Sequence, residues 1–442
     1  MEEKNVLNVF KLEKFYYVPK YDLVIEANDL DIEDINNIVF KYLGCRTINK
    51  FNSKTRLIIG NKYYGNSATI IISNKCMLKC KYCYSSSGTN CNNSFLSFNK
   101  YKKIVNILIN NAKIINKKTP WIDLTFHGGG EPTYNFSLLK RFIQYAIKKC
   151  KENNTLCLKR IITNGFFSIN QAKWLSENFN EVCFSIDGPS EINGFTRQSI
   201  SGKDITMIVI KNARYISENN CKVSFNTVLT NKSIGFGEKI AKFFLNNVPK
   251  LSSVQFTRYV PTIDGNNFIN TISNDEYLNI YKDARKVLKE RAKSFIGEEL
   301  RLNGYCKGTS LNTIYCHPNG FLTSCIQFDK NSKNNLYKIG EINKTIEIDN
   351  NNVNNIVKNN NDKLKNCNEC FAFYHCGGGC KAIYDNTNDF NYNWCQLVFK
   401  ILKFYMIEKL NNSNLNINYK KNDIDYNLKY TIFNKRYTNE NN

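Results

Sequence analysis

A strand-then-helix order repeats six times between residues 67 and 293 and limits the folds open to this chain. Each apolar strand segment ends at a polar or glycine-rich sequence, and an amphipathic helical segment follows. Strands joined through helices run parallel, so their carboxyl ends share one edge of the sheet. The order predicts an α/β fold with its active site at that edge, as in α/β barrels. The expected strands are 67–73, 121–126, 158–162, 181–186, 222–230 and 253–260, and the expected helices are 96–117, 135–151, 169–178, 204–219, 235–247 and 274–293.

Three cysteines follow the first expected strand. Cys76, Cys80 and Cys83 have the spacing C-x3-C-x2-C, and three thiolates this close suit a metal site. A four-iron cluster needs four ligands, so three cysteines would leave one iron open for a substrate or cofactor. Two alternatives stay open on the residues alone. One is a structural zinc site with a fourth protein ligand nearby, and the other is disulfides, which three crowded cysteines form poorly.

The cellular compartment decides whether the cysteines of this chain can form lasting disulfides. The start, MEEKNVLNVF, lacks the basic and apolar regions of a signal peptide, and no segment approaches the roughly 18 consecutive apolar residues of a membrane helix. We therefore expect a cytoplasmic protein without a membrane partner, in which 17 cysteines indicate metal or redox chemistry. The net charge of +23 is spread along a Lys-rich chain without a basic tail, so nucleic acid is not an expected partner.

The cysteine spacing, with Tyr82 before the third cysteine, resembles the signature of radical S-adenosylmethionine (SAM) enzymes. The resemblance implies an α/β partial (β/α)6 TIM-like barrel over residues 66–295, with a [4Fe-4S] cluster on Cys76, Cys80 and Cys83. It implies that the open iron binds SAM. An electron from a donor such as flavodoxin or ferredoxin would then cleave SAM to methionine and a 5′-deoxyadenosyl radical.

The same resemblance suggests SAM contacts at the ends of later strands. Gly129, Gly130 and Glu131 correspond to the family segment that binds the amino end of SAM, and a carboxylate suits an amino group. Ser185 lies in the matching segment of the fourth strand. Arg197, twelve residues later, falls where the family places a basic residue for the SAM carboxylate; the alternative is a surface ion pair. Asn164, after the third strand, is a further candidate.

A second group of cysteines lies in the C-terminal half, where Cys306 and Cys325 precede the run Cys367-x2-Cys370-x5-Cys376-x3-Cys380 and Cys395 follows it. These gaps resemble those of the SPASM extension of radical SAM enzymes. The resemblance implies two auxiliary [4Fe-4S] clusters. The spacing of Cys367, Cys370, Cys376 and Cys380 also permits a zinc ribbon. That alternative would leave the other three cysteines of this group without a role. By family pattern the first auxiliary cluster takes Cys306, Cys325 and Cys380, and the second takes Cys367, Cys370, Cys376 and Cys395.

Two positions depart from related patterns. Cys316 either closes the first auxiliary cluster or leaves it with an open iron. Ile326 follows Cys325 where anaerobic sulfatase maturases resemble one another in carrying an aspartate, which counts against that activity. We expect the three histidines, His127, His317 and His375, to be hydrogen-bonded structural residues.

The chain divides into four expected parts. Residues 1–65 form a small α+β module of two or three strands and a helix at 32–43, capped by Asp31, which resembles weakly the peptide-binding element of peptide-modifying relatives. Residues 66–295 form the barrel and 296–400 the SPASM domain, in which 331–366 is expected to be a polar linker. Residues 401–442 form a tail without a functional signal.

The function implied by the resemblance is that of a radical SAM oxidoreductase, a maturase that oxidatively crosslinks a ribosomally made precursor peptide, for example through a thioether. The enzyme alternative is maturation of a folded protein such as an anaerobic sulfatase. The non-enzyme alternative is an iron–sulfur electron-transfer or nucleic-acid-binding protein.

Overall fold

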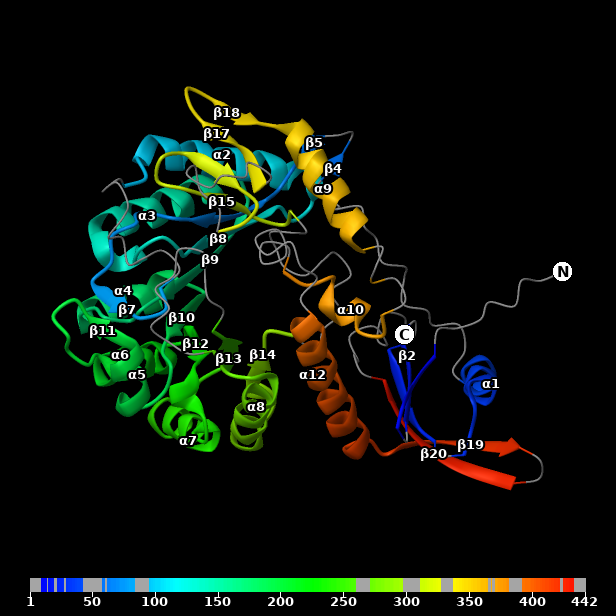
Figure 1. The fold of residues 1–442 in the computed structure, drawn as a ribbon. Coiled ribbons are helices and arrows are strands. Elements are labelled where there is room, and N and C mark those ends of the chain that lie inside the picture. The colour runs from blue at the N-terminus through cyan, green and yellow to red at the C-terminus, as the bar shows by residue number, and fades with distance from the viewer. Residues whose placement is uncertain are drawn as a thin grey trace.

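The computed structural model describes residues 9–13, 15–19, 22–27, 29–42, 58–59, 62–83, 95–259, 271–296, 311–326, 337–364, 367, 370–380, 392–421 and 424–432. Its largest sheet has eleven strands, in the order β14-β13-β12-β10-β9-β8-β6-β15-β16-β17-β18 (Figure 1).

Seven consecutive parallel strands of this sheet form the barrel wall. The six predicted strand–helix units are confirmed, and β14 adds a seventh strand. The strands are β6 (Ser67–Ile70), β8 (Trp121–Phe126), β9 (Leu156–Thr163), β10 (Glu181–Ser185), β12 (Lys222–Leu229), β13 (Ser253–Arg258) and β14 (Ala292–Ser294). The helices are α2 (Phe98–Ile115), α3 (Phe136–Glu152), α4 (Ile169–Asn178), α6 (Thr206–Glu218), α7 (Gly237–Asn247) and α8 (Asn274–Leu288).

Local sequence explains these elements. On β8, Ile122, Leu124 and Phe126 alternate with polar residues and are fully buried in the main core. At the start of α8, Ser273 and Glu276 form a capping box, in which each side chain accepts the other residue's backbone N–H.

The strands of the C-terminal half extend the barrel sheet. β15 (Ile314–Cys316) pairs in parallel with β6, and the antiparallel strands β16 (Phe321–Thr323), β17 (Lys338–Ile342) and β18 (Ile346–Ile348) follow it. The expected linker at 331–366 is wrong in its described part, because α9 (Asn350–Leu364) follows β18. Val353 and Ile356 bury one side of this Asn-rich helix in the core, which a reading of composition overlooks.

A second, five-stranded antiparallel sheet joins the two ends of the chain (Figure 1). The predicted N-terminal strands and helix are confirmed as β1 (Phe10–Leu12), β2 (Phe15–Val18), β3 (Leu23–Glu26) and α1 (Ile32–Tyr42). The sheet is completed by β19 (Leu415–Lys421) and β20 (Ile424–Ile432), which pair beside β3. We call this the terminal sheet. Between it and the barrel runs α12 (Tyr392–Asn411), which contacts both β3 and α8.

Candidate functional site

The three cysteines after β6 lie on a loop held from both sides. Its short strand β7 (Leu78–Cys80) pairs antiparallel with β11 (Arg197–Ser199), so Arg197 lies opposite Cys80. Cys76 Sγ accepts a hydrogen bond from Leu78 N at 3.4 Å, and Cys83 N donates to Cys80 O at 3.2 Å. All three thiols are half-buried.

Burial controls the protonation of the Cys76 and Cys80 thiols. It raises the pKa of Cys76 to about 12, with nearby Glu131, Cys80 and Cys83 adding to the increase. It raises the pKa of Cys80 to about 11, against the lowering effect of Arg197. The Cys76 and Cys80 thiols therefore keep their protons at neutral pH, and a bound iron cluster would supply the positive charge that makes them thiolates. The three residues fit cluster ligation, although across the described ranges no three His, Cys, Asp or Glu side chains are already grouped as a metal site.

The glycine loop after β8 packs directly on the cysteine loop. Gly130 N donates to Ser73 O at 2.8 Å, and Glu131 N donates to Lys75 O at 2.8 Å. A Cβ atom on Gly130 would lie 1.9 Å from Lys75 O. The glycine is therefore required by contact between two backbones, whereas the sequence indicated a contact with a ligand. The neighbouring Gly129 has a left-handed φ of +64°.

The carboxylate of Glu131 accepts hydrogen bonds from other groups of the protein. Its side chain is 3% exposed. Oε1 accepts from Thr133 N at 3.0 Å, Thr133 Oγ1 at 2.7 Å and Thr163 Oγ1 at 2.7 Å, while Oε2 accepts from Asn164 N at 2.8 Å. Burial raises the pKa of Glu131, and these four hydrogen bonds oppose the increase. Glu131 therefore joins the ends of β8 and β9, and a contact with the SAM amino group stays a prediction.

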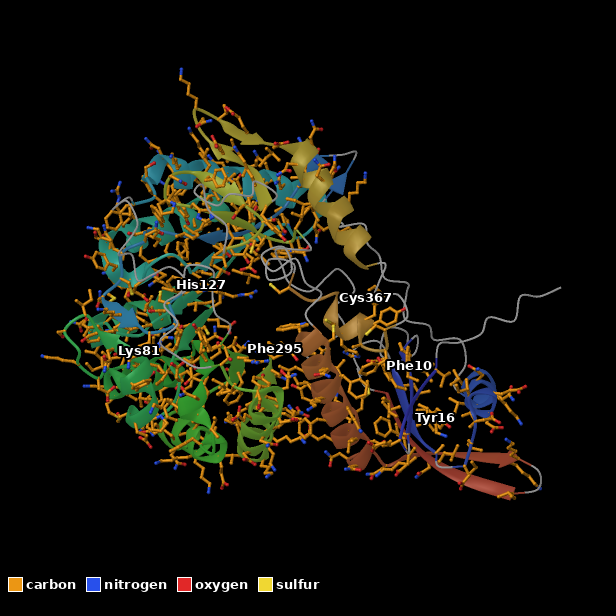
Figure 2. The ribbon with its side chains drawn as sticks, in the orientation of Figure 1. Phe10, Tyr16, Lys81, His127, Phe295 and Cys367 are labelled. Carbon is orange, nitrogen blue, oxygen red and sulfur yellow. The ribbon has the colours of Figure 1, made fainter. Side chains whose placement is uncertain are left out.

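Asn164 and Ser185 lie at neighbouring strand ends. Asn164 Nδ2 is 3.7 Å from Cys76 Sγ and 3.2 Å from Met77 Sδ, which places this amide against the cysteine loop. Ser185 is half-buried at the end of β10. Figure 2 labels His127, which follows β8 and is half-buried on the barrel side of the molecule. Burial lowers the pKa of His127 to about 4, so its imidazole is neutral at pH 7.

Tyr82 and Arg197 belong to a buried network centred on Asp187. Arg197 Nη1 donates to Tyr82 Oη at 2.5 Å, and Tyr82 Oη donates to Asp187 Oδ2 at 2.6 Å. Thr196 Oγ1 also donates to Asp187 Oδ2, and Val228 N donates to Oδ1. Arg197 is 8% exposed, which excludes the surface ion pair. Its Nε is buried without a hydrogen-bond partner among the described residues, so one donor stays available. Asp187 lies two residues after Ser185, and no sequence pattern marks it as a site residue.

The described cysteines of the C-terminal half fall into two groups. Cys325 and Cys380 both pack against Tyr337. Cys395, on α12, has its pKa raised to about 11 by burial and by Cys370 and Cys367, so these three lie near one another. Figure 2 labels Cys367. That these five residues bind clusters stays a prediction. Cys376 ends α10 (Phe373–Cys376) and packs against the main core, while Cys306 lies outside the described residues.

Cys316 is placed apart from both groups. It is fully buried in the main core on β15, beside Lys100, and its pKa is raised to about 12 by burial. Cys316 therefore packs in a different cluster of side chains from Cys325 and Cys380, which pack on Tyr337. His317 Nε2 contacts Thr323 Oγ1 at 3.1 Å, and His375 contacts Tyr17 and Asp22, so both are hydrogen-bonded as expected.

Residues 70–235 match the model of the Radical SAM superfamily. The uncharacterized protein MJ0907 of Methanocaldococcus jannaschii is 30% identical over 177 residues, covering 39% of this chain and 56% of that protein. The radical SAM cyclopropyl synthase TigE of Paramaledivibacter caminithermalis is 25% identical over 248 residues, covering 51% of each chain. The chain thus spans about half the length of these two curated relatives.

A longer match covers more of the fold. The cysteine-type anaerobic sulfatase-maturating enzyme of Clostridium perfringens is 24% identical over 376 residues, covering 77% of this chain and 96% of that enzyme. The structure of native anSMEcpe with bound AdoMet has a TM-score of 0.62 and 21% identity, covering 78% of this chain and 98% of the other. Streptococcus suis SuiB bound to precursor peptide SuiA has a TM-score of 0.50 and 17% identity, covering 82% of this chain and 80% of SuiB.

No described helix is both long enough and apolar enough to cross a membrane.

Proposed function

The chain belongs to the radical SAM superfamily through its domain at residues 70–235, and from this premise we propose that it is a SPASM-type maturase that crosslinks a ribosomally made peptide. The observation that carries the proposal is the grouping of its cysteines. Three lie on the loop after β6, and five in the C-terminal half fall into two further groups.

The first group would hold the cluster that the superfamily implies, through Cys76, Cys80 and Cys83. The chemistry that this cluster and SAM supply when bound is a reductive cleavage that gives methionine and a 5′-deoxyadenosyl radical. Beside it, Asn164 contacts the cysteine loop, and Arg197 Nε, which has no hydrogen-bond partner among the described residues, suits a carboxylate. Neutral His127 adds no charge to the barrel side of this site.

The two later groups would hold auxiliary clusters. Forming a thioether removes one hydrogen from a C–H bond and one from a thiol. The first leaves as a hydrogen atom in 5′-deoxyadenosine and the second as a proton, so one electron needs an acceptor. Cysteine-bound clusters are suited to that role. We propose Cys306, Cys325 and Cys380 for the first set and Cys367, Cys370, Cys376 and Cys395 for the second, and leave Cys316 out of both.

A peptide substrate is supported by two of the similar proteins. SuiB has been solved with its precursor peptide SuiA, and TigE is a cyclopropyl synthase. The alternative, maturation of a sulfatase, is favoured by the match over 96% of the Clostridium enzyme. Ile326 beside Cys325 counts against it, since the resemblance places an aspartate there.

The enzyme class is tested by release of 5′-deoxyadenosine from reconstituted, reduced protein given SAM. We expect release from the natural chain and none from the triple variant Cys76→Ala, Cys80→Ala, Cys83→Ala. A matched control is Cys221→Ala, which removes a buried thiol that donates to Phe179 O and lies in no cysteine group. Equal release from the triple variant and the natural chain would reject the enzyme and leave the electron-transfer alternative.

The substrate is tested with the neighbouring gene products. A peptide encoded beside this gene, incubated with the active enzyme and a flavodoxin or ferredoxin donor, should lose the mass of two hydrogen atoms for each crosslink. Conversion of a sulfatase cysteine to formylglycine, with no change in the peptide, would support the alternative.

A further inference from the structure

The terminal sheet reaches the cysteines of the C-terminal half through three buried polar side chains. Tyr17 on β2 and Asp22 beside β3 contact His375 in α10. Tyr17 Oη donates to Asp22 Oδ1 at 3.0 Å. His375 Nε2 lies 3.0 Å from Tyr17 Oη and 3.1 Å from Asp22 Oδ1. None of the three is more than 3% exposed, and we call them the polar triad.

The donors and acceptors of the triad are determined by its chemistry. Burial, followed by the charge of Asp22, raises the pKa of Tyr17 well above its usual value, so the phenol keeps its proton and donates it. Asp22 Oδ1 is then the acceptor for both neighbours, which requires a proton on His375 Nε2. Hydrogen bonds to a buried carboxylate are among the stronger ones in proteins. The triad therefore links two parts of the chain that are more than 350 residues apart.

On both sides of the polar triad the backbone has residues with positive φ. Asp22 has a left-handed φ of 49°, and its N–H donates to Pro19 O at 3.1 Å in the turn between β2 and β3. Asp is one of the few residue types that tolerate this region. After Cys376, three glycines in succession have positive φ values of 60°, 81° and 75°. They turn the chain from α10 towards Cys380 within four residues.

Aromatic side chains complete the interface around the triad. The ring of Phe371 lies 6.4 Å from Tyr17 and 6.0 Å from Phe10, both edge-on, and 4.8 Å from Phe399 of α12. Phe371 and Tyr17 both belong to the main core. The terminal sheet thus presents one face to α1 and the opposite face to the cysteine segment.

We propose that Tyr17 and Asp22 are positioning residues for the metal-binding segment 367–380, acting through His375. His375 directly precedes Cys376, so the terminal sheet would determine the orientation of this ligand and the potential of the second auxiliary cluster. Hydrogen-bonded partners outside the ligand shell commonly orient ligands and tune potentials. The part about the potential rests on the proposed clusters, whereas the part about orientation concerns the protein alone.

Orientation is tested on the full chain before metal is added, by following alkylation of each cysteine with peptide mass spectrometry. Asp22→Asn keeps the side-chain size, and Tyr17→Phe keeps the ring. We expect each to speed alkylation of Cys376 about fivefold, the effect of one lost hydrogen bond on local opening. Cys76 should react at an unchanged rate. The matched control is Glu13→Gln, which breaks the exposed pair with Lys403 at the same interface and should change neither rate.

The potential is tested on the reconstituted protein by redox titration followed with electron paramagnetic resonance. Asp22→Asn removes a buried negative charge, so one auxiliary cluster should become easier to reduce while the SAM-binding cluster keeps its potential. Unchanged Cys376 alkylation in both variants would overturn the proposal, as would equal acceleration at Cys76, which would indicate general unfolding. If the natural chain carries no auxiliary cluster, the proposed function fails, but the alkylation result still decides the role of the triad.

Discussion

The carboxylate of Glu131 accepts four hydrogen bonds, and this number predicts what a single-atom change would do. In Glu131→Gln, an amide NH2 replaces one oxygen. If Oε1 is kept for its three donors, the new NH2 faces the N–H of Asn164, donor against donor. Leaving a buried donor unsatisfied costs about 1–3 kcal/mol. We expect the midpoint of thermal unfolding to fall by several degrees in the absence of SAM.

Ser185→Ala is the matched comparison for that prediction. Ser185 is also a candidate SAM contact, but it is half-buried and ends β10 without a role in the Glu131 cluster. Its variant should keep the stability of the protein and lose only affinity for SAM, measured by calorimetry. If Glu131→Gln keeps full stability and loses only SAM affinity, the structural role of Glu131 is wrong.

At the scale of elements, the cysteine loop depends on the loop that crosses it. Gly130→Ala places a methyl group 1.9 Å from Lys75 O, so the two loops must separate. We expect reconstituted protein to hold less iron at the first cluster and to release little 5′-deoxyadenosine. Gly235→Ala is the control, because Gly235 has a φ of +77° with nothing within 4 Å of an added Cβ. If Gly235→Ala keeps its iron and its release of 5′-deoxyadenosine, backbone strain does not explain their loss in Gly130→Ala.

The elements that sequence predicted are those whose signal is local. The helix α1, with Asp31 as its cap, and the alternation on β8 were found because a few adjacent residues carry each pattern. Strands β7 and β11 have three residues each and exist through pairing with each other, so no periodicity marks them. The composition of α9, dominated by Asn, predicts a linker, although Val353 and Ile356 bury one side of the helix.

At the scale of the whole molecule, sequence patterns do not predict contacts between residues far apart in the chain. Spacing predicts the cysteine groups but not the pairing of β20 with β3, since nothing within residues 415–432 indicates a partner more than 400 residues away. The same reason hid the Asp187 network, whose members come from the cysteine loop and three later segments. Sequence patterns predict the ligands, whereas tertiary pairing determines which residues support them.

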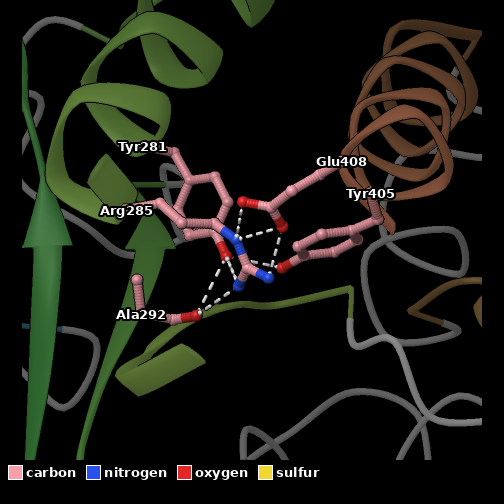
Figure 3. Close-up of polar contacts among 5 residues, drawn as sticks. All are labelled: Tyr281, Arg285, Ala292, Tyr405 and Glu408. Carbon is pink, nitrogen blue, oxygen red and sulfur yellow. Dashed lines mark hydrogen bonds and ion pairs between the residues drawn. The ribbon is translucent and has the colours of Figure 1, made fainter. Parts of the chain in front are cut away.

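The helix α12 packs on the terminal sheet and on α8 of the barrel, and Figure 3 shows its polar contacts with α8. Arg285 of α8 donates through Nε to both oxygens of Glu408, at 2.9 and 2.7 Å, and through Nη1 to Ala292 O. Tyr281 and Tyr405 join their hydroxyls at 2.6 Å beside this pair. Because Arg285 is only 5% exposed, removing its partner would leave a buried charge unpaired.

Glu408→Ala should therefore lower the free energy of unfolding by about 2–3 kcal/mol, less than a fully buried pair because the Glu408 side chain is 29% exposed. The control is Asp283→Asn on α8, the helix of Arg285. It weakens an exposed ion pair with Lys286 and should leave urea denaturation unchanged. The double change Arg285→Met, Glu408→Leu should recover most of the loss. Amide exchange should also quicken in β3 and β20, because α12 packs on both strands. Exchange confined to α8 would show instead that the terminal sheet is stable without this fastening.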